Sequence, residues 1–256
     1  MCRYGLDALL SVILAPRCAA CACVLDAPLA GPVCDTCWSQ VRILAAPFCR
    51  TCGDPLPSWR IISVALEQCP RCRRTNGSVD AARAAGEYEG SLRGILHAFK
   101  YEGRRRLARP LAAMMRAAGA ELLAGADWVV PVPLHPWRRM RRGFNQADDL
   151  ARRQGVPLLH ALWRARATVP QTGLNAGARR RNVRRAFEIS PFLSHARRQR
   201  LLKGRIVVLI DDVRTTGATL EACAAALKNA GVREVRALTV ALAAPPVARV
   251  RVGTAA

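Results

Sequence analysis

The sequence predicts an α/β protein with an open, mostly parallel sheet and flanking helices, preceded by a small cysteine-rich module. The chain has 256 residues and 51% of them are hydrophobic, which supports a sizeable core and excludes a disordered protein. Its first 72 residues contain ten of the eleven cysteines, eight of them in regularly spaced pairs. Beyond them, apolar segments of strand and helix length alternate, as they do in parallel sheets.

The cysteine module consists of four C-x-x-C pairs. The pairs are Cys18/Cys21, Cys34/Cys37, Cys49/Cys52 and Cys69/Cys72. This spacing is typical of structural zinc, because each pair offers two thiolates to one ion and two pairs complete a tetrahedron. We expect two Zn²⁺ sites formed by consecutive pairs, with cross-braced pairing, disulfides and redox pairs as alternatives. Cys2, Cys23 and Cys223 stay outside the pairs, and Cys223 is expected inside a buried helix.

The apolar stretch from Leu9 to Ala15 near the start of the chain predicts a short amphipathic helix that packs on the protein itself. Asp7 and the lack of a small-residue cleavage site disfavour a secretion signal. No run reaches the roughly 18 apolar residues of a membrane-spanning helix. We therefore expect a cytoplasmic protein with two domains, residues 1–76 and 77–256.

After a basic linker at 73–78, hydrophobic periodicity and turn residues divide the rest of the chain into elements. We expect strands at 81–88, 128–134, 156–163, 204–213 and 234–243. Helices are expected at 92–123, broken around Glu102-Gly103, at 144–155 and at 219–231, where Gly231 ends the last one. We expect residues 245–256 to form a frayed end or a final strand.

The most informative segment begins with the buried strand from Ile206 to Ile210. Asp211 and Asp212 end the strand, and Thr215-Thr216-Gly217-Ala218-Thr219 opens a helix. Ligands of open α/β sheets bind beyond the carboxyl ends of the strands, and a helix start offers free N–H groups to a phosphate. Two carboxylates would repel a phosphate unless they face sugar hydroxyls. The segment therefore predicts a cradle for a ribose 5-phosphate; the alternative is a plain strand end followed by a helix cap.

Several stretches resemble a known family. IDDVRTTGAT (210–219) resembles the phosphoribosyl pyrophosphate (PRPP) motif of type I phosphoribosyltransferases. The cysteine module and the three stretches FKYEGRRRLARPLA, PVPLHPWRRMRRGFNQADDLAR and QTGLNAGARRRNVRRAF resemble the ComF family, phosphoribosyltransferase-like proteins linked to competence and DNA utilisation. The resemblance covers almost the whole chain. It implies a type I phosphoribosyltransferase fold behind a double zinc ribbon.

The resemblance also implies roles for individual residues. Asp211 and Asp212 would bind the ribose hydroxyls of PRPP, with Mg²⁺ nearby on the ligand. The 5-phosphate would lie in the loop of Val213, Arg214, Thr215, Thr216, Gly217, Ala218 and Thr219. The pyrophosphate would lie near Leu134 and His135, under a mobile loop at 168–185 that contains Arg179, Arg180 and Arg181. Lys100 is either a further phosphate contact or a lysine on a helix surface. Arg214 departs from the family, where an apolar residue is frequent, and could contact the phosphate or a nucleic-acid backbone.

The formal net charge of +22 argues for an anionic partner. Residues 138–205 contain 18 Lys and Arg against three acids, a surplus of 15 that exceeds what one diphosphate can use. Single-stranded DNA could neutralise this positive surplus, and a solvated face is the alternative. The aromatic residues among these arginines could stack on bases or pack in the core: Trp137, Phe144 and Trp163. Three functions therefore stay open: a phosphoribosyltransferase, a non-catalytic DNA-binding accessory of an uptake machinery, and a PRPP-sensing regulator. The acceptor base is not encoded in any recognisable pattern.

Overall fold

The computed structural model describes residues 16–56, 68–75, 77–134, 140, 143–165 and 186–243. The predicted short helix at 9–15, the loop at 168–185 and the tail at 245–256 lie outside these ranges. The elements of the N-terminal half are α2 (Asp35–Ser39), α3 (Pro70–Arg74), β1 (Ala81–Glu87), α4 (Gly90–Tyr101), the 3₁₀ turn η2 (Arg105–Leu107), α5 (Ala108–Ala118), α6 (Ala120–Leu123) and β2 (Trp128–Pro131). Those of the C-terminal half are α8 (Gln146–Ala151), β3 (Leu162–Arg164), β4 (Phe187–Ile189), α10 (His195–Leu202), β5 (Ile206–Arg214), α11 (Ala218–Asn229) and β6 (Glu234–Leu242).

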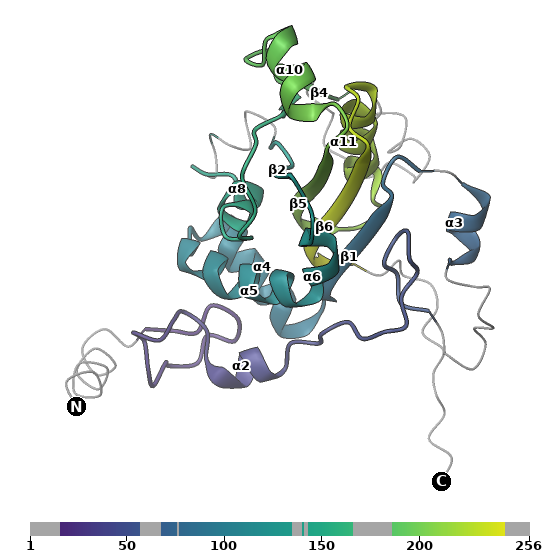
Figure 1. The fold of residues 1–256 in the computed structure, drawn as a ribbon. Helices are drawn as coiled ribbons and strands as arrows, with labels where there is room; N and C mark the ends of the chain where they lie inside the picture. Colours follow the sequence, from purple (N-terminus) through teal and green to yellow (C-terminus); the bar gives the residue numbers. More distant parts are fainter. Residues whose placement is uncertain are drawn as a thin grey trace.

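Four of these strands form the central sheet, in the order β1-β6-β5-β2, and every neighbouring pair is parallel (Figure 1). The expected open parallel sheet is thus confirmed. Strand β5 lies inside the sheet, between β6 and β2, which explains its unbroken apolar run. Strand β2 pairs with it as far as Ile210, and beyond that residue its carboxyl end pairs with β6 alone.

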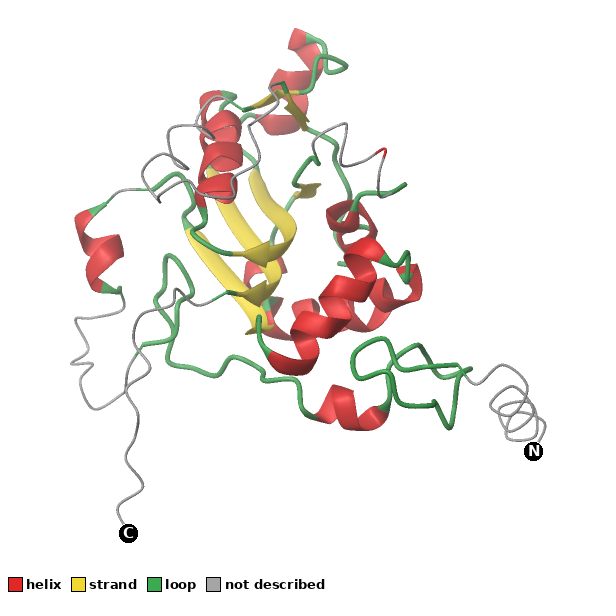
Figure 2. Ribbon diagram, turned by 180° about the vertical axis from the view of Figure 1, so that it is seen from behind, coloured by secondary structure: helices red, strands yellow, loops and turns green. Residues whose placement is uncertain are grey.

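Helices cover both faces of the sheet. Val208 and Ile210 of β5 pack toward α4, α5 and α8, whereas Val207 and Leu209 pack toward α11. Successive strand residues point to opposite faces, so one apolar run supplies two cores. Figure 2 shows the resulting three layers from behind, with α11 separated by the sheet from α4, α5 and α8.

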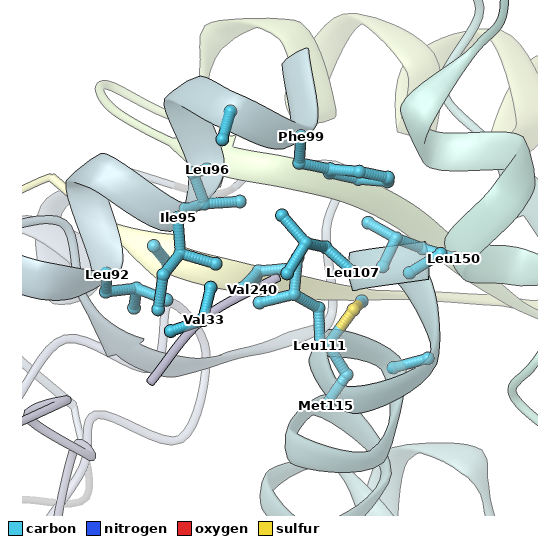
Figure 3. Packing of buried hydrophobic residues seen from close by; sticks show 14 of the residues in the cluster. Val33, Leu92, Ile95, Leu96, Phe99, Leu107, Leu111, Met115, Leu150 and Val240 are labelled. Atoms are coloured by element: carbon cyan, nitrogen blue, oxygen red, sulfur yellow. The ribbon is translucent and has the colours of Figure 1, made fainter. Parts of the chain in front are cut away.

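The cysteine module packs on this domain through its own apolar residues. Val33 belongs to the same core cluster as Leu92 and Ile95 of α4, and Figure 3 shows the three side chains together. The chain at 42–44 also runs antiparallel to β1, with Leu44 donating to the carbonyl of Ala85 at 3.1 Å. The module thus covers a sheet edge that would otherwise expose unpaired backbone groups.

The helical expectation for 92–123 is confirmed, and the chain breaks where the sequence indicated. Gly103 adopts a left-handed φ of 65°, which ends α4 and starts the turn that carries η2. The strand expected at 156–163 is wrong. Only Leu158 bridges to Val129 of β2, and the strand itself begins at Leu162 and pairs antiparallel with β4. This hairpin and α10 have too little periodicity in sequence to be predicted.

Candidate functional site

The segment that joins β5 to α11 forms the centre of the candidate site. Gly217 precedes the helix with φ at 77°, a conformation that strains any residue with a Cβ atom. Thr216 Oγ1 accepts the N–H of Ala218 at 3.4 Å. Within the described part of the chain, the N–H groups of Thr215, Thr216 and Gly217 donate to no backbone acceptor. The turn therefore presents several free donors at the positive end of a helix, which suits an anion.

Two carboxylates and one lysine border this turn. Asp211 Oδ1 accepts the N–H of Asp212 at 2.9 Å. Lys100 reaches over from the last turn of α4, and its Nζ lies 2.8 Å from Asp212 Oδ1, with 13% of each side chain exposed. Burial disfavours the charged lysine, but Asp212 and Asp211 outweigh it and raise the pKa of Lys100 above its usual value. Lys100 therefore lies largely buried beside the turn, paired with Asp212, and not on an exposed helix surface.

The guanidinium of Arg214 binds the cysteine module. Its side chain is 5% exposed and forms an ion pair with Asp54, a residue of the cysteine module 160 positions earlier. Arg71 binds the same carboxylate at 3.1 Å. The guanidinium that the sequence offered as a phosphate or nucleic-acid contact thus connects the end of β5 to the cysteine module, while its backbone remains at the start of the turn.

The stretch GFNQA (143–147) contains two amides that contact the ends of β2 and α4. Asn145 caps α8 by accepting the N–H of Ala147, and its amide donates to the carbonyl of Val132 at 3.2 Å, just after β2. The buried Gln146 donates to the carbonyl of Lys100 at 3.4 Å. These two amides hold the ends of β2 and α4 together. The family resemblance includes this stretch but implies no such role, although an Asn directly before a helical pattern is a capping signal.

Of the residues expected near the pyrophosphate, the structure describes Leu134 but not His135 or the three loop arginines. Leu134 follows β2, the parallel neighbour of β5, so it lies at the same edge of the sheet as the turn. His135, Arg179, Arg180 and Arg181 lie outside the described residues.

The second pair of C-x-x-C turns forms one compact cluster. The sulfurs of Cys49, Cys52, Cys69 and Cys72 all lie within 4.8 Å of one another, as consecutive pairing predicts. The distance between Cys52 Sγ and Cys69 Sγ is 3.7 Å. A regular tetrahedron with Zn–S bonds of about 2.3 Å gives about 3.8 Å between sulfurs, so this donor set fits zinc. The N–H of Cys69 also donates to Cys49 Sγ at 3.3 Å, a contact that stabilises a thiolate.

The first cluster contains one sulfur more than zinc needs. Cys18, Cys21, Cys23 and Cys34 lie within 4.8 Å of one another. Cys37, the expected fourth ligand, is buried and in side-chain contact with Cys21, Cys34 and Cys18. The Cys21–Cys34 sulfur distance of 3.8 Å fits a tetrahedral site, whereas the Cys21–Cys23 distance of 3.2 Å is too short for one. Three of the four expected ligands thus come together here, and Cys23 takes the place of Cys37 in the compact group.

Comparison with known proteins identifies the family. Competence protein F of Haemophilus influenzae is 31% identical over 214 residues, which cover 80% of this chain and 87% of that protein. The chain belongs to the ComF family. Further relatives are the DNA utilization protein YhgH of Escherichia coli K12, 30% identical with 80% and 87% coverage, and competence protein ComFC of Bacillus subtilis 168, 26% identical with 78% and 79% coverage.

Two family models match this ComF chain. A double zinc ribbon model matches residues 9–73, which include both cysteine clusters. A phosphoribosyl transferase domain model matches residues 140–252, which include β5, the turn and α11. The chain therefore combines a double zinc ribbon with a phosphoribosyltransferase domain, as the sequence resemblance implied.

Solved structures match this chain with lower sequence identity and with low TM-scores. A glutamine PRPP amidotransferase from B. subtilis aligns with TM-score 0.36 and 20% identity over 59% of this chain and 31% of that one. A hypoxanthine phosphoribosyltransferase from Staphylococcus aureus gives 0.29 and 15% over 59% and 71%. Within the described ranges, no helix has both the length and the apolar character of a membrane span.

The aromatic residues proposed for base stacking fall into different environments. Phe144 is half-buried against Phe99, with ring centroids 5.8 Å apart, and is a core residue. Trp163 on β3 is 41% exposed and remains accessible to a base. Trp137 lies outside the described residues. The buried Cys223 of α11 is a core residue, as expected.

Proposed function

We propose that this ComF-family chain binds PRPP, or a closely related ribose phosphate, together with Mg²⁺ at the carboxyl end of β5. The observation that carries the proposal is the juxtaposition of Asp211, Asp212 and Lys100 with the donor-rich turn before α11. Carboxylates next to free N–H donors suit a ligand that has hydroxyls beside a phosphate. The presence of a phosphoribosyltransferase domain supports this choice of ligand.

Each group has a distinct part in this proposal. Asp211 and Asp212 accept hydrogen bonds from the two ribose hydroxyls. The N–H groups of residues 215–219 and the threonine hydroxyls donate to the 5-phosphate. Lys100 forms an ion pair with Asp212 and places a positive charge beside the position where pyrophosphate would lie. Mg²⁺, when bound to the ligand, would neutralise pyrophosphate charge, and hard carboxylate oxygens are groups it accepts.

If the chain is an enzyme, the reaction is a displacement at C1 of the ribose. The bond from C1 to the pyrophosphate oxygen breaks, pyrophosphate leaves with the electron pair, and a nitrogen of the acceptor forms the new bond and loses its proton. The described residues contribute positioning and charge stabilisation of the leaving group. A PRPP-sensing regulator would use the same cradle without this step.

Calorimetric titration with PRPP and Mg²⁺ tests the proposal. We expect saturable binding by the wild type and a loss of at least about a hundredfold in the Asp211→Asn/Asp212→Asn variant, since each lost charge-assisted hydrogen bond is worth about 1.5–3 kcal/mol. Asp35→Asn, at an exposed position on α2, is the control and should bind like the wild type. Absence of binding by the wild type, or equal binding by all three proteins, would contradict the proposal.

A second candidate function is binding of single-stranded DNA by the basic segment at 138–205. Arg197 and Arg200 of α10 are exposed, Phe192 just before this helix is 80% exposed, and Trp163 is also accessible. Exposed guanidinium groups beside accessible rings are the elements of a strand-binding surface. This function is compatible with PRPP binding, and the salt dependence of the DNA affinity tests it.

A further inference from the structure

A second basic site lies between the first zinc ribbon and the turn that joins α4 to α5. A cavity of about 390 Å³ opens there. Its lining includes Arg17 from the ribbon and Arg104, Arg105 and Arg106 from the turn. We call this cavity the arginine pocket. It shares no lining residue with the turn at 211–219, so it is a separate site.

The arginines of this pocket are only partly neutralised. Asp149 binds Nε and Nη2 of Arg105 at 2.8 and 2.7 Å, which fixes the guanidinium and leaves its Nη1 without that partner. Arg104 Nε is 4.0 Å from Glu102. Arg106 forms no ion pair with any described residue. Positive charge therefore exceeds negative charge around the cavity, and the ligand that fits is an anion.

Arg17 adds a fourth guanidinium from the opposite wall. Its Nη1 donates to the carbonyl of Ala22 at 3.1 Å, which orients the group without removing its charge. Guanidinium forks match the geometry of phosphate oxygens and hold them with two parallel bonds. Several arginines on two walls of one cavity thus indicate a phosphate and not a single carboxylate.

The cavity volume and its apolar wall indicate the nature of the part of the ligand that is not phosphate. The cavity is within the range of about 300–1,000 Å³ typical of sites for small organic molecules. Leu25 and the prolines at 16, 28 and 32 supply an apolar wall from the ribbon. An arginine-rich rim above an apolar wall suits a phosphate ester with a flat organic part, since guanidinium planes also stack on bases.

We propose that the arginine pocket binds a nucleotide through its phosphate, either as a free mononucleotide or as part of a DNA strand. The pocket depends on the first zinc ribbon, because Arg17 directly precedes Cys18 and Pro32 lies two residues before Cys34. The inference is independent of PRPP binding at β5.

The test uses the full zinc-loaded chain and two probes, deoxyadenosine 5′-monophosphate and a fluorescein-labelled oligothymidine of twelve nucleotides. Arg104→Gln/Arg106→Gln removes two charges from the pocket and leaves the Arg105–Asp149 pair intact. We expect at least about a tenfold loss of affinity, since hydrogen bonds to charged groups are worth about 1.5–3 kcal/mol each. Arg93→Gln, exposed on α4 and outside the pocket lining, should bind like the wild type.

The two probes distinguish the sources of the phosphate. Variant-sensitive binding of the mononucleotide alone assigns the pocket to free nucleotides, and variant-sensitive binding of the oligonucleotide alone assigns it to strands. PRPP titration of the same variant checks that the β5 site is unchanged. No binding of either probe, or binding that the pocket variant does not weaken relative to Arg93→Gln, would overturn the inference.

Discussion

Two cysteines compete for one position in the first zinc site. Cys18, Cys21 and Cys34 are common to either choice, and the fourth ligand is Cys37 or Cys23. Cys37 is 4% exposed and held on the short helix α2, whereas Cys23 is exposed and 3.2 Å from Cys21. The four sulfurs within 4.8 Å of one another include Cys23 and not Cys37, but tetrahedral zinc needs sulfurs about 3.8 Å apart, so the short Cys21–Cys23 contact disfavours Cys23. The C-x-x-C spacing keeps Cys37 as the expected ligand.

Serine variants test this assignment by zinc content. The wild type should hold about two zinc ions per chain, because each cluster fits one. We expect Cys37→Ser to retain about one and Cys23→Ser to retain both, measured by elemental analysis of the gel-filtered protein. The reverse result would make Cys23 the ligand and Cys37 a buried thiol of the core.

Short-range chemistry was readable from the sequence, and long-range pairing was not. The spacing of the cysteines and the order Asp211, Asp212, Thr215–Thr219 are local signals, because the residues involved are neighbours in the chain. The partners of Lys100 and Arg214 come from distant elements, so nothing next to either residue indicates them. In the sequence, nothing distinguishes either residue from an exposed basic residue. Only folding brings Asp212 to Lys100 and Asp54 to Arg214.

For helices and strands too, strong local patterns were readable from the sequence and long-range packing was not. The buried parallel strands and the amphipathic helices α4 and α5 have strong periodicity and were predicted correctly. Strands β3 and β4 have three residues each, too few for a period-two pattern to stand out. Apolar residues at 156–163 suggested a strand, yet most of them pack as irregular chain beside β2. Tertiary packing thus decided the conformation where the local signal was weak.

The Arg214–Asp54 pair connects two elements and yields a stability prediction. Asp54→Ala should cost about 2–3 kcal/mol of unfolding free energy, less than the usual range for a fully buried pair because Asp54 is 32% exposed. The cost arises because Arg214 stays buried without a counter-charge. Urea unfolding measures it, and hydrogen exchange at 210–219 should speed up since the pair anchors the start of the turn.

Two further variants make this prediction specific. Asp54→Ala/Arg214→Met removes both charges and should recover most of the lost stability, because apolar replacement of a buried pair is often neutral. Arg71→Gln removes only the exposed partner of Asp54 and should cost less than about 1 kcal/mol. If Asp54→Ala unfolds like the wild type, the pair does not hold the turn to the zinc ribbon.

The charge of the whole molecule leads to the last prediction. A surplus of 22 positive charges exceeds what the β5 site and the arginine pocket together can use, and 15 of them arise between residues 138 and 205. If this segment binds single-stranded DNA, the logarithm of the affinity should fall linearly with the logarithm of the salt concentration, by about 0.7 per phosphate contacted. Arg197→Gln/Arg200→Gln on α10 should reduce that slope by about 1.4, measured by fluorescence anisotropy.

Arg93→Gln/Arg233→Gln removes two exposed charges outside the segment and should leave the slope nearly unchanged. Equal effects of the two variants would assign the DNA affinity to net charge alone, and a flat salt dependence would remove DNA from the function of the segment.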